Sequence, residues 1–364
     1  MDVVSVYRQL HAKPERSGEE RLTSQYIRQA LEQAGYEPHC VGAVGVYADL
    51  VSDPALPWLV LRADMDALPV QENSCAVCPS ENRGVMHACG HDAHCAMLLG
   101  AAEQLRGQQL PQNIRFVFQP AEETTRGAAE LIADGVMPKD VLACFAMHVW
   151  PGIDRGVVAT RAGALMASSD VYDIRIQGRS VHCAQREKGA DALRTAVEIA
   201  ARLPAIEQAD GDGNAVLFCG SIHSGNAHNV VPDEASLFGT IRTYSAAVRQ
   251  KIKSRLEQTV ADAAARFGTT ARVIWDGGCP SVYNDARLIE QLRTLVPVLD
   301  ENATPTLAAE DFACYLEYAP GVMLWLGIGD TPPLHNEAFY VPEQILPDGV
   351  ALWVKLAARD WKGG

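Results

Sequence analysis

Three short apolar runs in this sequence each end just before side chains that can bind metal ions. They are residues 58–62 before Asp64 and Asp66, residues 114–118 before Glu122 and Glu123, and residues 141–147 before His148. Such runs are typical of buried strands. Because α/β enzymes place their chemistry where strands end, this arrangement predicts an α/β fold with a metal site beside a central sheet.

Residues 87–94, His-Ala-Cys-Gly-His-Asp-Ala-His, form the densest group of metal-binding side chains. His335 adds another imidazole near the C-terminus. Thiolate, imidazole and carboxylate groups are the side chains that bind zinc-like ions. The neighbouring Glu122 and Glu123 add a different capability, because one can hold a metal ion while the other moves a proton. We therefore predict a metal-dependent hydrolase.

Length, charge and cysteine content narrow the class of protein. A chain of 364 residues suggests two domains, and a net charge of −14 argues against nucleic acid and anionic membranes as partners. No stretch approaches the ~20 apolar residues of a membrane span, and no signal peptide is visible. The ten cysteines are therefore expected to be reduced, in a cytoplasmic protein. Cys75 and Cys78 have redox or zinc-ribbon spacing, but without a second such pair we take them as incidental.

Residues 167–275 have the pattern of a separate domain. The predicted order is strand 171–176, helix 191–203, strands 215–222 and 236–243, helix 247–267 and strand 270–275. This β-α-β-β-α-β order is that of a ferredoxin-like domain. Since it contains none of the strong ligand candidates, we predict that it is inserted into a catalytic domain made of residues 1–166 and 276–364. Within the second of these segments we expect a helix at 285–299 and a strand at 322–326.

Seven motifs spread over nearly the whole chain carry a resemblance to one known family. They are Leu10-His11 with Pro14-Glu15, Arg62-Ala-Asp-Met-Asp-Ala-Leu-Pro69, Met86-His-Ala-Cys-Gly-His-Asp92, Phe118-Gln-Pro-Ala-Glu-Glu123, Asn229-Val-Val-Pro-Asp233, Gly239-Thr-Ile-Arg242 and Glu310-Asp-Phe312. Together they resemble the aminoacylase, hippurate hydrolase and auxin-conjugate hydrolase family of dinuclear metallopeptidase-like amidohydrolases. The resemblance implies a catalytic domain with a central sheet and two divalent metal ions. It also implies a lid domain that usually mediates dimerisation, so a homodimer is expected.

Five residues are predicted to hold the two ions. A pair of neighbouring ions needs a shared anionic ligand, and Cys89 is well placed for this because the ions themselves would stabilise its thiolate. As at the matching family positions, the remaining ligands would be His91, Glu123, His148 and His335. A lone histidine is more often structural, but this combination favours the ligand interpretation. Mixed sulfur, nitrogen and oxygen ligands suit zinc, with manganese, cobalt or nickel as alternatives.

Glu122 is predicted to act as general base and acid. It would take the proton of the attacking water and return it to the leaving amine. The alternative is that Glu122 is a ligand and Glu123 is merely solvated, but the resemblance favours Glu122 as the base. Asp64, Asp66 and Asp92 are predicted to orient imidazoles by hydrogen bonds, while a capping or turn role stays open for Asp92.

Three residues of the predicted lid are candidates for binding the substrate. His182 and Asn229 match the family's lid histidine and asparagine, which could donate hydrogen bonds to the developing oxyanion; turn roles are the alternative. In relatives this histidine can reach the partner subunit's site. Arg242 either clamps the carboxylate of the amino-acid half or is a surface arginine at a strand end. Segments 183–188 and 124–127 depart from the family pattern and should border the substrate pocket, so no particular substrate is transferred.

The predicted activity is hydrolysis of an N-acyl amino acid, or a similar small amide, to a carboxylate and a free amino acid. An N-acetyl-diaminopimelate deacetylase or a dipeptidase would use the same metals with a different pocket. A catalytically silent binding protein is a further interpretation, which the intact Glu122 and all five ligand positions argue against. A mononuclear zinc protein would instead hold one structural ion without hydrolysis.

Overall fold

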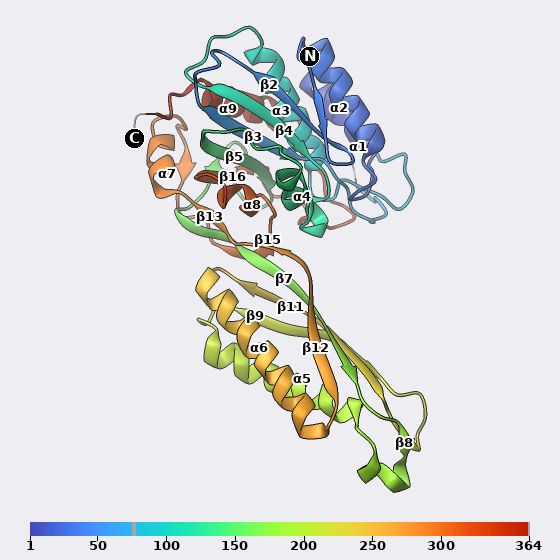
Figure 1. Ribbon diagram of the computed structural model, residues 1–364. Helices are drawn as coiled ribbons and strands as arrows, with labels where there is room; N and C mark the ends of the chain where they lie inside the picture. The colour runs from blue at the N-terminus through green and yellow to red at the C-terminus, as the bar shows by residue number, and fades with distance from the viewer. Residues whose placement is uncertain (75–77, 363–364) are drawn as a thin grey trace. The chain divides into compact units, whose positions relative to one another are not determined.

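The computed structural model describes residues 1–74 and 78–362, and the chain forms two compact units (Figure 1). Unit 1 consists of Met1–Leu165, Val282–Thr304 and Glu310–Gly364, and unit 2 consists of Met166–Ser281 and Pro305–Ala309. The sequence-based division places the second boundary at 275/276. The difference arises because strand β12 (Thr270–Cys279) continues past Trp275, the predicted end, through an irregularity in its pairing.

The predicted α/β fold with a central sheet is confirmed in unit 1. Its eight strands lie in the order β1 (His39–Val41), β2 (Gly45–Leu50), β4 (Asn113–Gln119), β3 (Trp58–Asp64), β5 (Val141–Trp150), β16 (Gly321–Gly327), β6 (Val158–Ala159) and β14 (Leu299–Asp300). The four central strands β4, β3, β5 and β16 are parallel, whereas β1 and β2 are antiparallel. The carboxyl ends of the four parallel strands therefore meet at one edge of the sheet, where α/β proteins bind ligands.

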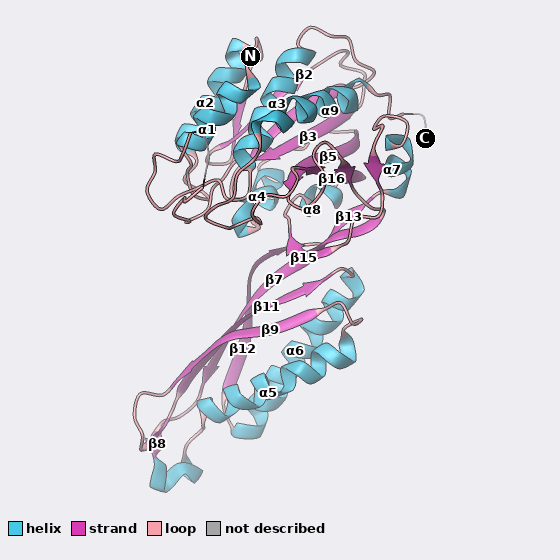
Figure 2. Ribbon diagram, turned by 180° about the vertical axis from the view of Figure 1, so that it is seen from behind, coloured by secondary structure: helices cyan, strands magenta, loops and turns pink. Residues whose placement is uncertain are grey.

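Helices cover both faces of this sheet (Figures 1 and 2). Helix α3 (His91–Leu105) packs on β3 and β5, with α1 (Val3–Ala12), α2 (Arg21–Gln33) and α9 (Leu346–Ala358) against it. On the other face α4 (Gly127–Ala133) packs on β4 and contacts α8 (Ala313–Leu316). Nearly every residue of α3 is buried, as expected for a helix that is apolar on all sides. The N-terminus of this buried helix carries His91, so the metal-binding motif starts inside the core.

Unit 2 has the predicted ferredoxin-like arrangement. Its main strands are β7 (Gly163–Gln177), β9 (Val216–Ser224), β11 (Glu234–Thr243) and β12, with sheet order β12-β7-β11-β9 and antiparallel pairing throughout. Helices α5 (Ala192–Asp210) and α6 (Ala246–Phe267) pack together on the sheet. Tyr172, Ile174 and Ile176 of β7 point to these helices with the two-residue period of a half-buried strand. The short strands of unit 2 are β8 (Val181–His182), β10 (Val230–Val231) and β15 (Thr306–Ala309), and β13 (Val282–Asn284), which pairs with β7, begins the second segment of unit 1.

The helix expected at 285–299 is shorter than predicted. Helix α7 (Ala286–Leu292) ends at Leu292, and β14 begins at Leu299. Pro297 lies between them, and proline cannot continue a helix and restricts the residue before it. Apolar spacing alone therefore overestimated the length.

The structure also describes most of the cysteines and all helices long enough to be considered for a membrane span. Cys40, Cys78, Cys89, Cys95, Cys144, Cys183 and Cys219 are free thiols, while Cys75 of the Cys75 and Cys78 pair lies outside the described residues. Among the described residues, no helix combines the length and the apolar character that crossing a membrane requires.

Candidate active site and metal centre

Gly90 allows the loop that carries Cys89 to pack tightly on β5. Its backbone is left-handed, with φ of 87°. A Cβ added to Gly90 would lie 2.5 Å from Cγ2 of Val149, far inside van der Waals contact. Only glycine adopts this left-handed backbone without strain and has no Cβ to clash with Val149. The tight turn places Cys89 and the first residue of α3, His91, beside the end of β5.

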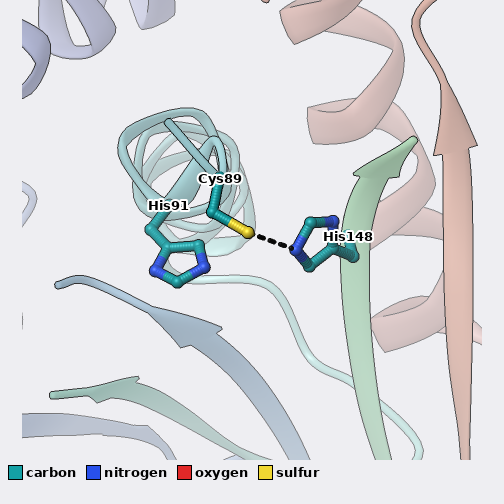
Figure 3. Close-up of side chains that lie close together, drawn as sticks. All are labelled: Cys89, His91 and His148. Carbon is teal, nitrogen blue, oxygen red and sulfur yellow. Dashed lines mark hydrogen bonds between the residues drawn. The ribbon is translucent and has the colours of Figure 1, made fainter. Parts of the chain in front are cut away.

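Cys89, His91 and His148 bring three donor atoms together (Figure 3). These atoms all lie within 4.8 Å of one another, and the Cys89 Sγ to His148 Nε2 distance is 3.4 Å. All three residues are buried. Residues from a loop, a helix start and a strand thus converge on one point, as a metal centre requires.

A second group of donor atoms shares the same cysteine. It consists of Cys89, Glu123 and His335, again within 4.8 Å of one another, with 3.5 Å between His335 Nε2 and Glu123 Oε1. His335 adopts a left-handed conformation, φ 66°, which costs a residue with a Cβ roughly 1–2 kcal/mol. Its N–H donates to the carbonyl of Ala88 at 2.8 Å, which ties the two loops together. Because both groups contain Cys89, its thiolate is where two ions could be bridged.

The hydrogen bonds of His91 and His148 leave one nitrogen of each ring available. His91 Nδ1 donates to the backbone carbonyl of Asp66 at 3.0 Å, and His148 Nδ1 donates to that of Val149 at 2.7 Å. Since a carbonyl only accepts, each Nδ1 carries a proton, and Nε2 is the nitrogen that could bind a cation once it is deprotonated. Among the described residues, the buried His91 Nε2 and Glu123 Oε1 have no hydrogen-bond partner. This donor set fits divalent cations.

The charges around the site favour a bound cation. Burial by itself would lower the pKa of His91. The negative charges of Asp64 and Asp66 have the larger effect and raise this pKa to about 10. Burial and the neighbouring Glu123 raise the pKa of the Cys89 thiol well above its usual range. The carboxylates therefore attract positive charge, and a thiolate at Cys89 needs it nearby.

Glu122 is buried next to these donors, in the short helix η1 (Glu122–Thr124) that follows β4. Burial, and then the nearby carboxylate of Glu310, raise the pKa of Glu122 well above its usual range. The N–H of Asp311 donates to Glu122 Oε1 at 3.3 Å. A carboxyl group with a raised pKa beside a metal centre has the properties of a proton acceptor and donor.

Each of the three predicted aspartates orients an imidazole. Asp66 Oδ1 lies 3.0 Å from His91 Nδ1, so this aspartate acts on a predicted ligand. Asp64 Oδ1 lies 2.6 Å from Nδ1 of His94, whose Nε2 accepts from the N–H of Val149. Asp92 Oδ2 lies 2.5 Å from Nδ1 of His11, and its Oδ1 accepts from Ala93 N–H in the first turn of α3. Asp92 therefore contacts an imidazole, and its bond to Ala93 lies inside the first turn of α3, whose N-terminus has no side-chain cap.

The three candidate lid residues lie in unit 2. His182 of β8 pairs with Val230 of β10, and Cys183 N–H donates to the carbonyl of Asn229 at 2.9 Å, so His182 and Asn229 are close in space. His182 is exposed and its Nδ1 accepts from Ala184 N–H. Arg242 lies near the end of β11 between Ser169 and Val216 and is partly buried. Their predicted roles toward a substrate remain predictions.

Residues 60–359 match peptidase family M20/M25/M40. The chain belongs to this family. Like its members, the protein is a hydrolase, and its two-unit fold is that of the M20 enzymes.

Individual M20 relatives cover almost the whole chain. An N-acetyl-L-cysteine deacetylase of Bacillus subtilis is 35% identical, over 94% of this chain and 84% of its own. An N-acetyldiaminopimelate deacetylase of Streptococcus uberis is 32% identical, over 92% and 93%. The crystal structure of a dinuclear metal binding peptidase of the M20 family from Bacillus subtilis has a TM-score of 0.84 at 32% identity, over 98% of this chain and 96% of its own.

The M20 site also contains a buried network to which the sequence analysis assigned no role. Arg62 donates to Gln119 Oε1 at 2.8 Å, to Asp64 Oδ2 at 2.6 Å and to Asp311 Oδ1 at 2.9 Å. Its guanidinium also lies 3.0 Å from Glu310 Oε1. Arg62, Glu310 and Asp311 stand in motifs that support the family resemblance, and this was the available signal. Their partnership depends on the strands and loops that bring them together.

Proposed function

We propose that this M20 hydrolase is a metal-dependent amidohydrolase that cleaves N-acyl amino acids, or similar small amides, to a carboxylate and a free amino acid. The main support is that two groups of donor atoms share Cys89 while the buried Glu122 lies beside them. Two relatives that are at least 32% identical are deacetylases of N-acetylated amino acids.

Two divalent ions would be held by Cys89, His91, Glu123, His148 and His335. When bound, such ions polarise a carbonyl and lower the pKa of water. We propose zinc because the donors combine sulfur, nitrogen and oxygen, with manganese, cobalt or nickel as alternatives. A dinuclear metal binding relative from Bacillus subtilis supports the number of ions.

Glu122 would carry the proton. Its carboxylate takes a proton from the attacking water and delivers it to the leaving amine, and the N–H of Asp311 holds one oxygen during both steps. From the lid, His182 and Asn229 would donate hydrogen bonds to the oxyanion. Arg242 would bind the carboxylate of the amino-acid half.

A second candidate is deacetylation of N-acetyl-diaminopimelate, which the relative from Streptococcus uberis supports. It uses the same metals and the same base but needs a pocket for a longer, charged side chain. A dipeptidase activity belongs to the same chemistry. These candidates differ in substrate alone, so a panel of substrates separates them.

We expect metal-reconstituted protein to hydrolyse at least one compound of a panel of N-acetyl, N-benzoyl and indoleacetyl amino acids, N-acetyl-diaminopimelate and dipeptides. Release of the free amino acid is measured for each, with zinc and manganese in parallel. The rank order of kcat/KM identifies the acyl group. A protein that binds two ions and cleaves no amide in the panel would contradict the proposed reaction.

We also propose that the protein is a homodimer formed through unit 2. Strand β9 is the last in its sheet, so one edge has no neighbouring strand among the described residues, and such edges pair readily. β9 also carries the exposed Phe218 and Ile222. Light scattering should give twice the mass of one chain for the wild type. For Phe218→Lys it should give the mass of a single chain. Ile274→Lys, an exposed position on β12 at the opposite edge, is the matched control and should leave the dimer intact.

A further inference from the structure

The loop that carries Glu122 contains two left-handed residues and is closed by internal hydrogen bonds, from Thr125 N–H to the carbonyl of Glu122 at 2.7 Å and from Gly127 N–H to that of Ala121 at 3.2 Å. Ala121 and Thr125, on either side of η1, both have positive φ angles, 56° and 55°. A Cβ on Gly127 would lie 1.7 Å from the carbonyl oxygen of Pro120, so the loop closes tightly. Left-handed backbone at residues with a Cβ persists only where surrounding contacts impose it. The position of Glu122 therefore depends also on groups outside its own segment.

Three carboxylates from distant segments supply those contacts. Ala121 N–H donates to Glu20 Oε1 at 2.8 Å, Glu123 N–H to Asp66 Oδ2 at 3.0 Å, and Ala128 N–H to Asp311 Oδ2 at 2.9 Å. Each of these hydrogen bonds gives a backbone N–H of the loop a partner from another segment. Asp66 also orients His91, and Asp311 also binds Arg62, so both have other tasks.

Apart from backbone groups of its own loop, at Gly18 and Glu20, the carboxyl group of Glu20 has Ala121 as its partner in the described structure. Glu20 precedes α2, but its side chain makes no cap of that helix. Instead it reaches Ala121, which is 101 residues away in the sequence. The side chain is fully buried, and its Oε2 has no hydrogen-bond partner among the described residues. A buried carboxylate is costly to desolvate, and burial raises the pKa of Glu20 to about 7, so its contact with Ala121 calls for an explanation.

We propose that Glu20 is a positioning residue, which holds Ala121 in its left-handed conformation and thereby sets where the carboxyl group of Glu122 lies. The argument rests on the proposed function in one respect, that Glu122 is the general base. Ala121 is the residue directly before Glu122, so a change in its backbone moves the base. A displacement of about 1 Å at a reacting group can cost on the order of 10²-fold in rate.

Two substitutions distinguish the effect of the length of the Glu20 side chain from the effect of its charge. Glu20→Asp keeps the charge but is one methylene shorter, so it should lose the contact with Ala121 N–H. Glu20→Gln loses the charge but keeps the length and an oxygen that can accept this bond. We expect Glu20→Asp to lower kcat by about 10²-fold, with KM and the number of bound ions unchanged, and Glu20→Gln to retain most of the wild-type kcat. Glu19→Asp, at the exposed neighbouring residue, is the control.

Amide hydrogen exchange of the segment 119–128, measured by mass spectrometry on the same variants, tests the contact without relying on activity. Exchange at this segment should be faster in Glu20→Asp than in wild type, Glu20→Gln or Glu19→Asp. Wild-type exchange and wild-type kcat in Glu20→Asp would overturn the proposal, as would a loss of kcat in Glu20→Gln equal to that in Glu20→Asp. Absence of turnover in the wild type would instead contradict the proposed function, and the exchange comparison would still decide the role of Glu20.

Discussion

A Glu122→Gln variant is expected to keep both metal ions and to lose about 10²- to 10⁴-fold of the wild-type kcat on the best substrate of the panel. The amide has nearly the shape of the carboxylate, and its oxygen can still accept the hydrogen bond from Asp311 N–H. It cannot take a proton from water or return one to the amine. Steady-state kinetics and metal analysis on the same preparation provide the measurement.

The control for this substitution is Glu130→Gln, an exposed glutamate at the end of the first turn of α4. It should have wild-type kcat and metal content. If Glu122→Gln turned over normally, another group would have to be the base. If it lost one of the ions instead, the alternative that Glu122 is itself a ligand would be supported.

Replacing Cys89 by alanine is expected to reduce the metal content from two ions per chain to one or fewer and to abolish turnover. Cys89 is the member that the two donor groups have in common, so its removal takes a ligand from both. The substitution also removes the anionic ligand that the two cations would share. Metal content after extensive dialysis, measured by plasma mass spectrometry, is the decisive quantity.

Cys144→Ala is the matched control, because Cys144 is a buried thiol on β5, four residues before His148, and belongs to none of the donor groups found among the described residues. It should keep two ions. A Cys89→Ala protein with two tightly bound ions would contradict the bridging role. A wild type that binds one ion and hydrolyses nothing would favour a mononuclear zinc protein.

The prediction of the fold succeeded where sequence patterns are local. The βαββαβ order of unit 2 could be predicted because strands such as β7 bury every second residue and helices such as α6 bury every third or fourth. The same reasoning overestimated the helix at 285–299, since apolar spacing continues past the point where Pro297 prevents a helix. It also ended β12 at Trp275, because an irregularity in strand pairing is a property of two strands and not of one.

The candidate site divides in a similar way. Side-chain chemistry indicated the metal site and Cys89, because few residue types bind zinc-like ions and they are concentrated in short motifs, while the family resemblance implied the other four ligands and Glu122 as the base. The structure places all five in two donor groups that share Cys89. The role of Glu20 was not predicted, since a glutamate before a helix is usually a cap or a solvated residue.

The sequence by itself determined which donor side chains, which candidate proton carrier and which order of strands and helices this protein contains, because each depends on residue type and short-range spacing. Tertiary structure alone decided which atoms meet. Arg62 binds Asp311 across 249 residues and Glu20 holds Ala121 across 101, and no local pattern specifies such pairs. They form because the packed sheet and its helices bring distant loops to one edge, where buried polar groups must find partners.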